Sequence, residues 1–128
     1  MAMIQRPNAV GLFPCREIVV EDRTRNVTLV NTFKSLHLGT FPSLATPFVV
    51  YTVLTDGIGD VKLELTISRG DTLEEIYHKS YDLVFDDPLY QLRLWWQIKS
   101  CNFPQPGLYQ VTLLGSRELI AQCVFMVT

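Results

Sequence analysis

Short segments in which apolar and polar residues alternate recur along most of this chain. In residues 61–68 every second side chain is apolar and those between are polar or charged. A period of two is typical of a β-strand with one face in a core and the other in solvent. Residues 90–99 alternate in the same way. Residues 48–54 are apolar on both faces, which predicts a central strand with one face in the core and the other covered.

Three further strands are predicted from shorter patterns. Residues 16–21 and 27–33 are rich in β-formers and flank a polar turn, so they are expected to form a hairpin. Residues 76–85 also favour a strand. Thr72 and Glu75 have capping-box spacing, so one helical turn before this last strand stays open.

The last segment, residues 106–127, is the most informative, because it opens with Pro-Gly-Leu-Tyr, turns at residues 115–117 and returns apolar. It predicts the closing hairpin of a sandwich. The fold class is therefore expected to be all-β, a single-domain immunoglobulin-like antiparallel β-sandwich of about 7–9 strands. We expect one domain over residues 1–128, with residues 1–14 as an N-terminal extension and residues 15–128 as the sandwich core.

Charge and composition narrow the range of partners. The chain has 128 residues, of which 48% are hydrophobic, and a net charge of −2 from 11 basic and 13 acidic side chains. It contains no cluster of Lys and Arg of the kind that nucleic acid or anionic lipid requires. Residues 1–14 contain no continuous apolar run, so we expect neither a signal peptide nor a membrane anchor. These observations predict a cytoplasmic protein without a nucleic-acid or membrane partner.

The cysteines favour the same compartment. Cys15, Cys101 and Cys123 are an odd, widely spaced set without a CxxC motif. This spacing fits reduced, buried thiols better than a disulfide framework or a zinc site.

Several segments of the chain are familiar in combination. They are Cys15 and Asp22 around the first strand, the strand at 26–33, Phe41-Pro42, the segment 54–60 and the terminal 106–109. In this combination the chain resembles a bacterial family of small, uncharacterised β-sandwich proteins. The resemblance implies an immunoglobulin-like sandwich in a bacterial cytoplasm. Because that family has no assigned activity, the resemblance supplies no functional residues.

Candidate catalytic groups do not converge in the sequence. His37 and His78 are far apart and lack the HxH or HExxH spacing of metal sites. Cys15 and Cys101 have few basic neighbours that would favour a reactive thiolate. An active site needs a nucleophile, a base and an orienting group together, so the sequence predicts a protein that is not an enzyme and needs no cofactor.

Four aspartates suggest a metal site. Asp56 and Asp60 bracket a glycine-rich turn, and Asp86 and Asp87 occupy another loop. Sandwich loops that gather several aspartates can bind Ca²⁺ through hard oxygen ligands. Aspartate and glycine are also the ordinary residues of tight turns, and the strand order decides whether the two loops meet.

The strongest candidate for partner binding is Trp95. On the alternating pattern of its strand, Trp95 points away from the core on the same face as Arg93 and Gln97. Tryptophan and arginine are enriched at interface hot spots. Two alternatives stay open. A register shift could turn Trp95 inward and Trp96 outward, or residues 1–13 could fold over Trp95.

Two other surface features each allow a functional and a purely structural interpretation. An edge strand, either the first strand or residues 76–85, could accept a strand from another chain, although nearby acidic residues such as Glu75 could block this pairing. Arg69-Gly70-Asp71 spells an integrin-ligand tripeptide, but it is expected at a hairpin tip, where turn chemistry explains it.

The sequence therefore favours a non-enzymatic β-sandwich that works as an interaction or assembly module and binds a protein partner or itself through the face of Trp95, Arg93 and Gln97. The alternative is a sandwich domain that binds Ca²⁺ or a small ligand through Asp56, Asp60, Asp86 and Asp87.

Overall fold

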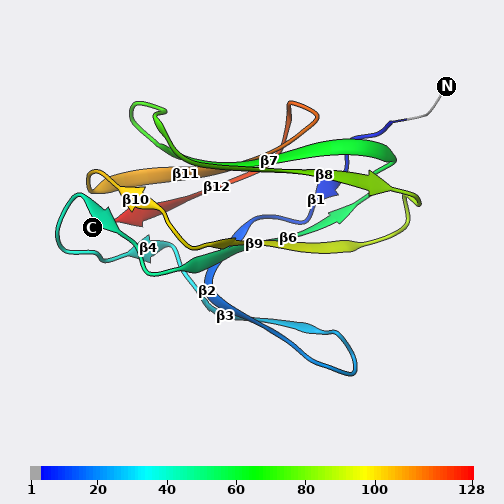
Figure 1. Ribbon diagram of the computed structural model, residues 1–128, viewed down its shortest axis with the longest axis horizontal. Coiled ribbons are helices and arrows are strands. Elements are labelled where there is room, and N and C mark those ends of the chain that lie inside the picture. Colours follow the sequence, from blue (N-terminus) through cyan, green and yellow to red (C-terminus); the bar gives the residue numbers. More distant parts are fainter. Residues whose placement is uncertain (1–3) are drawn as a thin grey trace.

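The computed structural model describes residues 4–128, which form two β-sheets packed face to face (Figure 1). No helix occurs in these residues, and none is therefore long and apolar enough to cross a membrane. The all-β sandwich predicted from the sequence is confirmed, and its immunoglobulin-like character stays a prediction. The strands of residues 4–128 are β1 (Asn8–Ala9), β2 (Phe13–Val20), β3 (Val27–Thr32), β4 (Ser35–Leu36), β5 (Ser43–Leu44), β6 (Phe48–Thr55), β7 (Gly59–Arg69), β8 (Glu75–Phe85), β9 (Leu92–Ile98), β10 (Asn102–Phe103), β11 (Gly107–Gly115) and β12 (Glu118–Val127).

The first sheet is built around β6. This strand pairs with β9 along one edge and with β1 and β2 along the other, and β2 in turn pairs with β3. The second sheet has the order β4-β12-β11-β7-β8. Its neighbours are antiparallel except for β4 and β12, which are parallel. β5 and β10 form a separate two-stranded ribbon.

The core lies between the two sheets and follows the predicted alternation. The apolar residues of β7 are almost completely buried, and they face residues of β6 and β9 from the first sheet. The largest side chains that are fully buried in this core are Trp96, Tyr109, Phe48, Phe103 and Phe125.

Strand β6 is covered on both faces, as its continuous apolar pattern predicts. Phe48, Val50 and Leu54 belong to the main core. Val49 and Tyr51 lie on the opposite face of the strand and are nevertheless buried. The buried hydroxyl of Thr52 donates a hydrogen bond to the carbonyl of Gly11, so its polar group is satisfied.

The N-terminal residues belong to the sandwich more closely than the predicted boundary at residue 15 indicates. β1 pairs with the end of β6, β2 already begins at Phe13, and Leu12 is buried. A two-residue strand after a proline is too short to show an alternating pattern, which explains why the sequence placed it outside the core. The first three residues of the predicted extension lie outside the described residues.

Most non-glycine residues with a left-handed backbone lie between strands, and Asn31 (φ 54°) in β3 is an exception. Ser116 (φ 49°) and Arg117 (φ 70°) form the two-residue turn between β11 and β12, which confirms the predicted closing hairpin. Positive φ at both central positions is the requirement of a type I′ turn. The segment before β8 is a turn and not a turn of helix. Glu74 N–H donates to the hydroxyl of Thr72 in a turn, and the strand begins at Glu75.

Candidate interaction groove

The hairpin of β2 and β3 leaves the main sheet partway along its length. Only residues 13–15 of β2 pair with β6, whereas residues 17–20 pair with β3 alone. Figure 1 shows this hairpin extending away from the sandwich beside β6 and β9. The hairpin therefore forms a wall beside the outer face of the first sheet.

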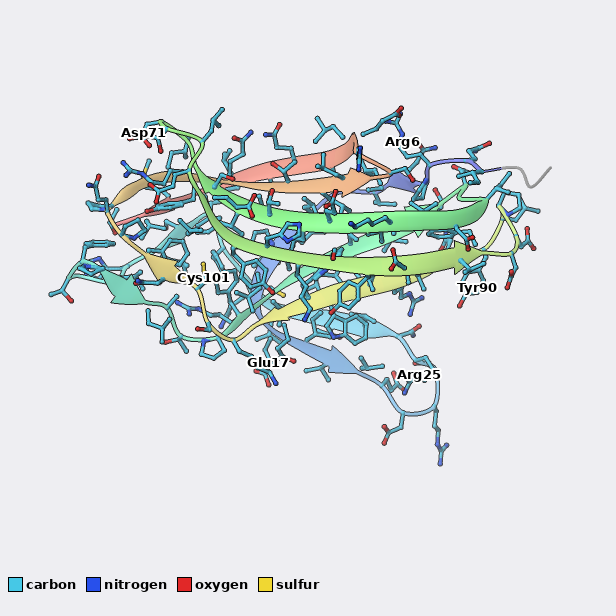
Figure 2. All side chains as sticks on the ribbon, turned by 45° about the horizontal axis from the view of Figure 1, so that its top comes forward. Arg6, Glu17, Arg25, Asp71, Tyr90 and Cys101 are labelled. Atoms are coloured by element: carbon cyan, nitrogen blue, oxygen red, sulfur yellow. The ribbon has the colours of Figure 1, made fainter. Side chains whose placement is uncertain are left out.

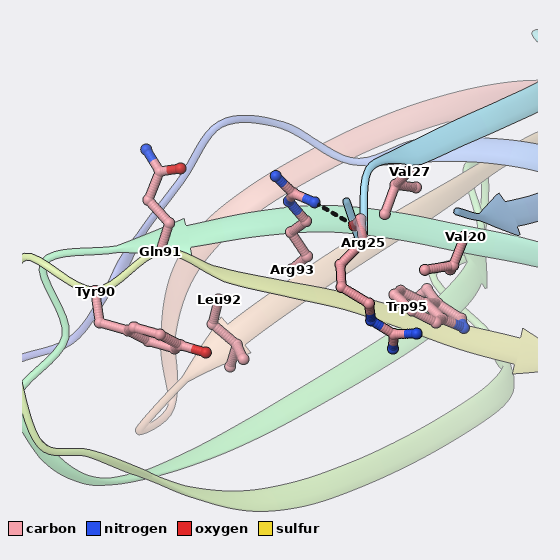
Figure 3. Close-up of a pocket in the computed structure, with 8 residues that line it drawn as sticks. All are labelled: Val20, Arg25, Val27, Tyr90, Gln91, Leu92, Arg93 and Trp95. Atoms are coloured by element: carbon pink, nitrogen blue, oxygen red, sulfur yellow. Dashed lines mark hydrogen bonds between the residues drawn. The ribbon is translucent and has the colours of Figure 1, made fainter. Parts of the chain in front are cut away.

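A groove of about 450 Å³ lies between this hairpin and β9. It is lined by Val20, Arg25 and Val27 from the hairpin, by Leu92, Arg93 and Trp95 from β9, and by Tyr90 and Gln91 from the segment before β9 (Figure 3). We call it the Trp95 groove.

Trp95 is held in a fixed orientation inside this groove. It lies directly across from Tyr51 in the β6–β9 pairing, and the two rings stack with centroids 6.4 Å apart and an interplanar angle of 28°. Trp96, its neighbour, is 1% exposed and belongs to the core, so β9 has the predicted register. The hairpin covers part of Trp95, which is only half-buried.

Two arginines flank the tryptophan. The guanidinium of Arg93 donates a hydrogen bond from Nη1 to the carbonyl oxygen of Arg25, at 2.7 Å. Arg25 has a left-handed backbone (φ 60°), and its amide donates to the carbonyl of Glu21 at 2.9 Å, which closes the hairpin turn. The ion pairs found within residues 4–128 involve other side chains, so neither guanidinium has a carboxylate within 4.0 Å there. Figure 3 shows the Arg25 guanidinium beside Trp95.

The loop between β8 and β9 forms the rim of the groove. The Asp87 carboxylate accepts a hydrogen bond from the amide of Leu89 at 2.9 Å, and the Asp87 carbonyl accepts one from the amide of Tyr90 at 3.1 Å. This ordered turn leaves Leu89 86% exposed and Tyr90 61% exposed. Figure 2 shows Tyr90 and Arg25 at one end of the molecule, with Asp71 at the other.

The predicted partner-binding residues are only partly brought together. Arg93 and Trp95 both line the groove. Gln97 lies farther along β9, opposite Val49, where it is exposed and outside the groove lining.

Two of the four predicted metal-binding aspartates, Asp56 and Asp87, already accept hydrogen bonds. The two loops do meet, because the amide of Asp56 donates to the carbonyl of Pro88 at 2.9 Å. The Asp56 carboxylate accepts hydrogen bonds from the side chains of Asn8 and Thr55, at 3.0 and 3.1 Å. Asp60 lies on β7, and Asp86 and Asp87 stay in the next loop. Among residues 4–128 no three His, Cys, Asp or Glu side chains are grouped so that they could hold a metal ion.

The histidines and cysteines lie away from the groove. His37 contacts the hydroxyl of Thr128 at 3.2 Å, and His78 contacts Glu64 at 3.4 Å. Burial raises the pKa of the Cys101 thiol to about 12 and that of Cys123 to about 11. Burial also raises the pKa of Cys15. These shifts disfavour the thiolate, which is the reactive form.

The Arg-Gly-Asp tripeptide is tied into the tip of the β7–β8 hairpin. Arg69 donates to Asp71 at 2.8 Å and to Gln105 at 2.9 Å, and its side chain is only 15% exposed. The arginine therefore stabilises its own turn, in agreement with the interpretation of the motif as turn chemistry.

Comparison with known proteins places the chain in a family. A model described as a family of unknown function (DUF6941) matches residues 13–128. The chain belongs to this family. The resemblance to an uncharacterised family is thereby confirmed, whereas a bacterial origin stays a prediction. Comparison of the DUF6941 chain with curated protein sequences gave no match.

Solved structures give weaker similarities. The alkylpurine DNA glycosylase AlkC of Pseudomonas fluorescens, bound to DNA containing an abasic site analogue, matches with a TM-score of 0.46 and 13% identity over 74% of this chain and 27% of that chain. The β-glucosidase of Listeria innocua in complex with isofagomine matches with a TM-score of 0.49 and 12% identity over 94% of this chain. The β-glucosidase of Kluyveromyces marxianus gives 0.47 and 11% over 81%. The DUF6941 chain spans only 16% of each glucosidase, and these likenesses carry no argument about its activity.

The sequence pattern does not reveal the other groove residues of the DUF6941 chain, above all Arg25 and Tyr90. Arg25 lies in a hairpin turn far along the chain from Trp95, and Tyr90 falls on the core-facing side of the alternating pattern of residues 90–99 although it is exposed. The only sequence signal for Arg25 was its place in a polar turn that follows an apolar strand. Its position beside Trp95 depends on how the hairpin bends over the sheet, which no local pattern encodes.

Proposed function

We propose that this chain is a non-enzymatic interaction module that works in the cytoplasm and binds a protein partner, or a second copy, through the Trp95 groove. One observation carries the proposal. A tryptophan held by stacking shares one groove with two arginines that form no ion pair within the described residues. Trp, Tyr and Arg are the residues most enriched at interface hot spots, where they fill pockets and bind carboxylates.

The rim supports the same function. Leu89 and Tyr90 are large apolar residues that an ordered turn holds in solvent. Exposed apolar groups beside a groove are typical of binding surfaces. The cytoplasmic location is supported by the three cysteines, which stay unpaired.

The test is purification of the tagged chain from its native host, with Trp95→Ala and Arg25→Ala as variants. The Arg25 side chain forms no hydrogen bond or ion pair within residues 4–128, so we expect Arg25→Ala to keep the fold. We expect a stoichiometric partner, or a dimer, that both variants lose. Val124→Ala is the control, because Val124 is exposed on β12 in the other sheet and should keep the partner. A monomer without any partner would exclude the proposal, and so would a partner that both groove variants retain.

A further inference from the structure

A second hollow adjoins the Trp95 groove. Its volume is about 390 Å³, and it lies between the end of β8 and the start of β9. Asp86 and Asp87 supply its charged side chains, and it shares Tyr90 and Leu92 with the Trp95 groove. We call it the Asp86 hollow.

The two depressions carry opposite charge. The lining of the Trp95 groove contains Arg25 and Arg93 and no carboxylate. The lining of the Asp86 hollow contains two carboxylates and no basic side chain. The Asp86 carboxylate forms no hydrogen bond or ion pair within residues 4–128, and Asp87 uses one oxygen for the amide of Leu89. One surface therefore presents unpaired positive and negative charge on either side of Tyr90 and Leu92.

The same surface also carries exposed apolar side chains. Val84 is 66% exposed and lines the Asp86 hollow together with Tyr90, and Leu89 next to Tyr90 in the chain is exposed as well. Three large apolar side chains within seven consecutive residues, 84–90, form a patch of the kind that protein contacts usually cover.

We propose that this surface is a homodimer interface, in which the Trp95 groove of each copy receives the Asp86 loop of the other. The inference rests on the proposed function, because it names the occupant of the same groove. A two-fold axis near Tyr90 and Leu92 places the Trp95 groove of each copy against the Asp86 hollow of the other. The contact between Arg25 and Arg93 of one copy and Asp86 and Asp87 of the other therefore occurs twice in the interface. Tyr90 and Leu89 then pack against their counterparts at the centre of the interface.

Charge complementarity favours a second copy over an unrelated acidic peptide. A peptide in the Trp95 groove would neutralise Arg25 and Arg93 but would leave the Asp86 hollow and the exposed residues 84–90 uncovered. A second copy covers both depressions and the apolar patch between them. Complementary charge of this kind mainly fixes the partner and the register of an interface.

The experiment measures the oligomeric state of the full chain by sedimentation equilibrium between about 1 and 100 µM. Arg25→Glu and Asp86→Lys are the variants, because neither side chain forms a hydrogen bond or ion pair within residues 4–128. Arg117→Glu, in the exposed β11–β12 turn, is the matched control with the same change in net charge as Arg25→Glu. Circular dichroism melts verify that all variants fold.

We expect wild type and Arg117→Glu to dimerise in the micromolar range. Arg25→Glu alone and Asp86→Lys alone should each dimerise at least about tenfold more weakly than wild type, because like charges then face each other twice in the interface. An equimolar mixture of Arg25→Glu and Asp86→Lys should associate as tightly as wild type, because every facing pair is again opposite in charge. Higher NaCl should weaken the wild-type dimer through screening.

Three results would overturn the proposal. They are a wild-type monomer at all concentrations, a dimer that either variant leaves unchanged, and a mixture that fails to restore association. A monomer that still captures a Trp95-dependent partner from its host would reject the homodimer alone and leave the proposed function standing. A monomer without any partner would reject both.

Discussion

At the scale of single residues, Gly57 shows how tightly one turn is packed against the core. A Cβ atom at this position would lie 2.6 Å from Cγ of Phe85, and Phe85 is buried. The neighbouring atoms belong to the aromatic ring, so they cannot turn aside as the end of a flexible chain could. Gly57→Ala is therefore expected to destabilise the fold by about 1–3 kcal/mol through overpacking. Urea denaturation measures this change.

The double variant Gly57→Ala/Phe85→Leu is the control. A smaller side chain at position 85 makes room for the added methyl group. The double variant should therefore lose less free energy of unfolding than the two single variants lose in sum. Strictly additive losses would show that Phe85 is not the cause of the clash.

Cys101 gives the protein a defined response to alkaline pH. Burial raises the pKa of its thiol in the folded state to about 12, from an ordinary value of 9.0. Above pH 9 the unfolded chain releases this proton while the folded chain keeps it. The stabilisation is therefore fully present below pH 9 and is lost as the pH rises toward 12, with a slope of up to about 1.4 kcal/mol per pH unit.

Urea denaturation at intervals between pH 8 and 10 tests this dependence. Most of this range lies below pH 10.0, the ordinary tyrosine pKa at which the unfolded chain loses the protons of Tyr77 and Tyr109, and burial raises the pKa of both tyrosines in the fold. Cys101→Ala should flatten the decline, although Cys15 and Cys123 continue to contribute because burial raises their pKa values too. A slope that the substitution leaves unchanged would contradict the assignment to Cys101.

At the scale of elements, β8 is an edge strand that is protected from pairing with other chains. It pairs only with β7, and its other edge has no partner strand within residues 4–128. Lys79 lies opposite Leu65, on the side of the strand that faces the core, with its ammonium 5.9 Å from the centre of the Tyr81 ring. An inward-pointing charge on an edge strand is a known protection against strand addition.

Lys79→Leu is expected to cause aggregation, because it makes the core-facing side of this edge strand apolar from Tyr77 to Leu83. Light scattering at increasing protein concentration measures the effect. Lys79→Arg keeps the charge and should stay as soluble as wild type. Equal solubility of the leucine variant would mean that another feature, such as the acidic residues near Glu75, protects the edge.

The elements themselves were largely predictable because each has a local cause. The alternation of β7 and β9 and the turn at Ser116 and Arg117 follow from neighbouring residues alone. The short strand β1 could not be found in this way. Two residues show no period, and their pairing depends on β6, which lies more than forty positions along the chain.

At the scale of the whole molecule, the candidate site shows where local patterns stop being informative. Trp95 and Arg93 were found because they share one face of one strand. Arg25 joins them only through the bend of the β2–β3 hairpin, and Gln97, farther along β9, lies outside the groove lining. The neighbouring positive and negative depressions depend on the same arrangement, so no single segment of sequence reveals them.

The packing of the two aspartate loops determines whether the protein can bind calcium. The turn at Asp56 meets the loop at Pro88, as the calcium hypothesis requires, but Asp56 and Asp87 already accept hydrogen bonds within their turns. Ca²⁺ needs about six to eight oxygen ligands, and a ligand that binds only the folded state raises its melting temperature. We expect the same melting temperature in calcium at about 1 mM, in magnesium at equal concentration and in chelator. A rise that is specific to calcium and reversed by chelator would restore the metal site, and it would also place a cation where the homodimer requires the arginines of a second copy.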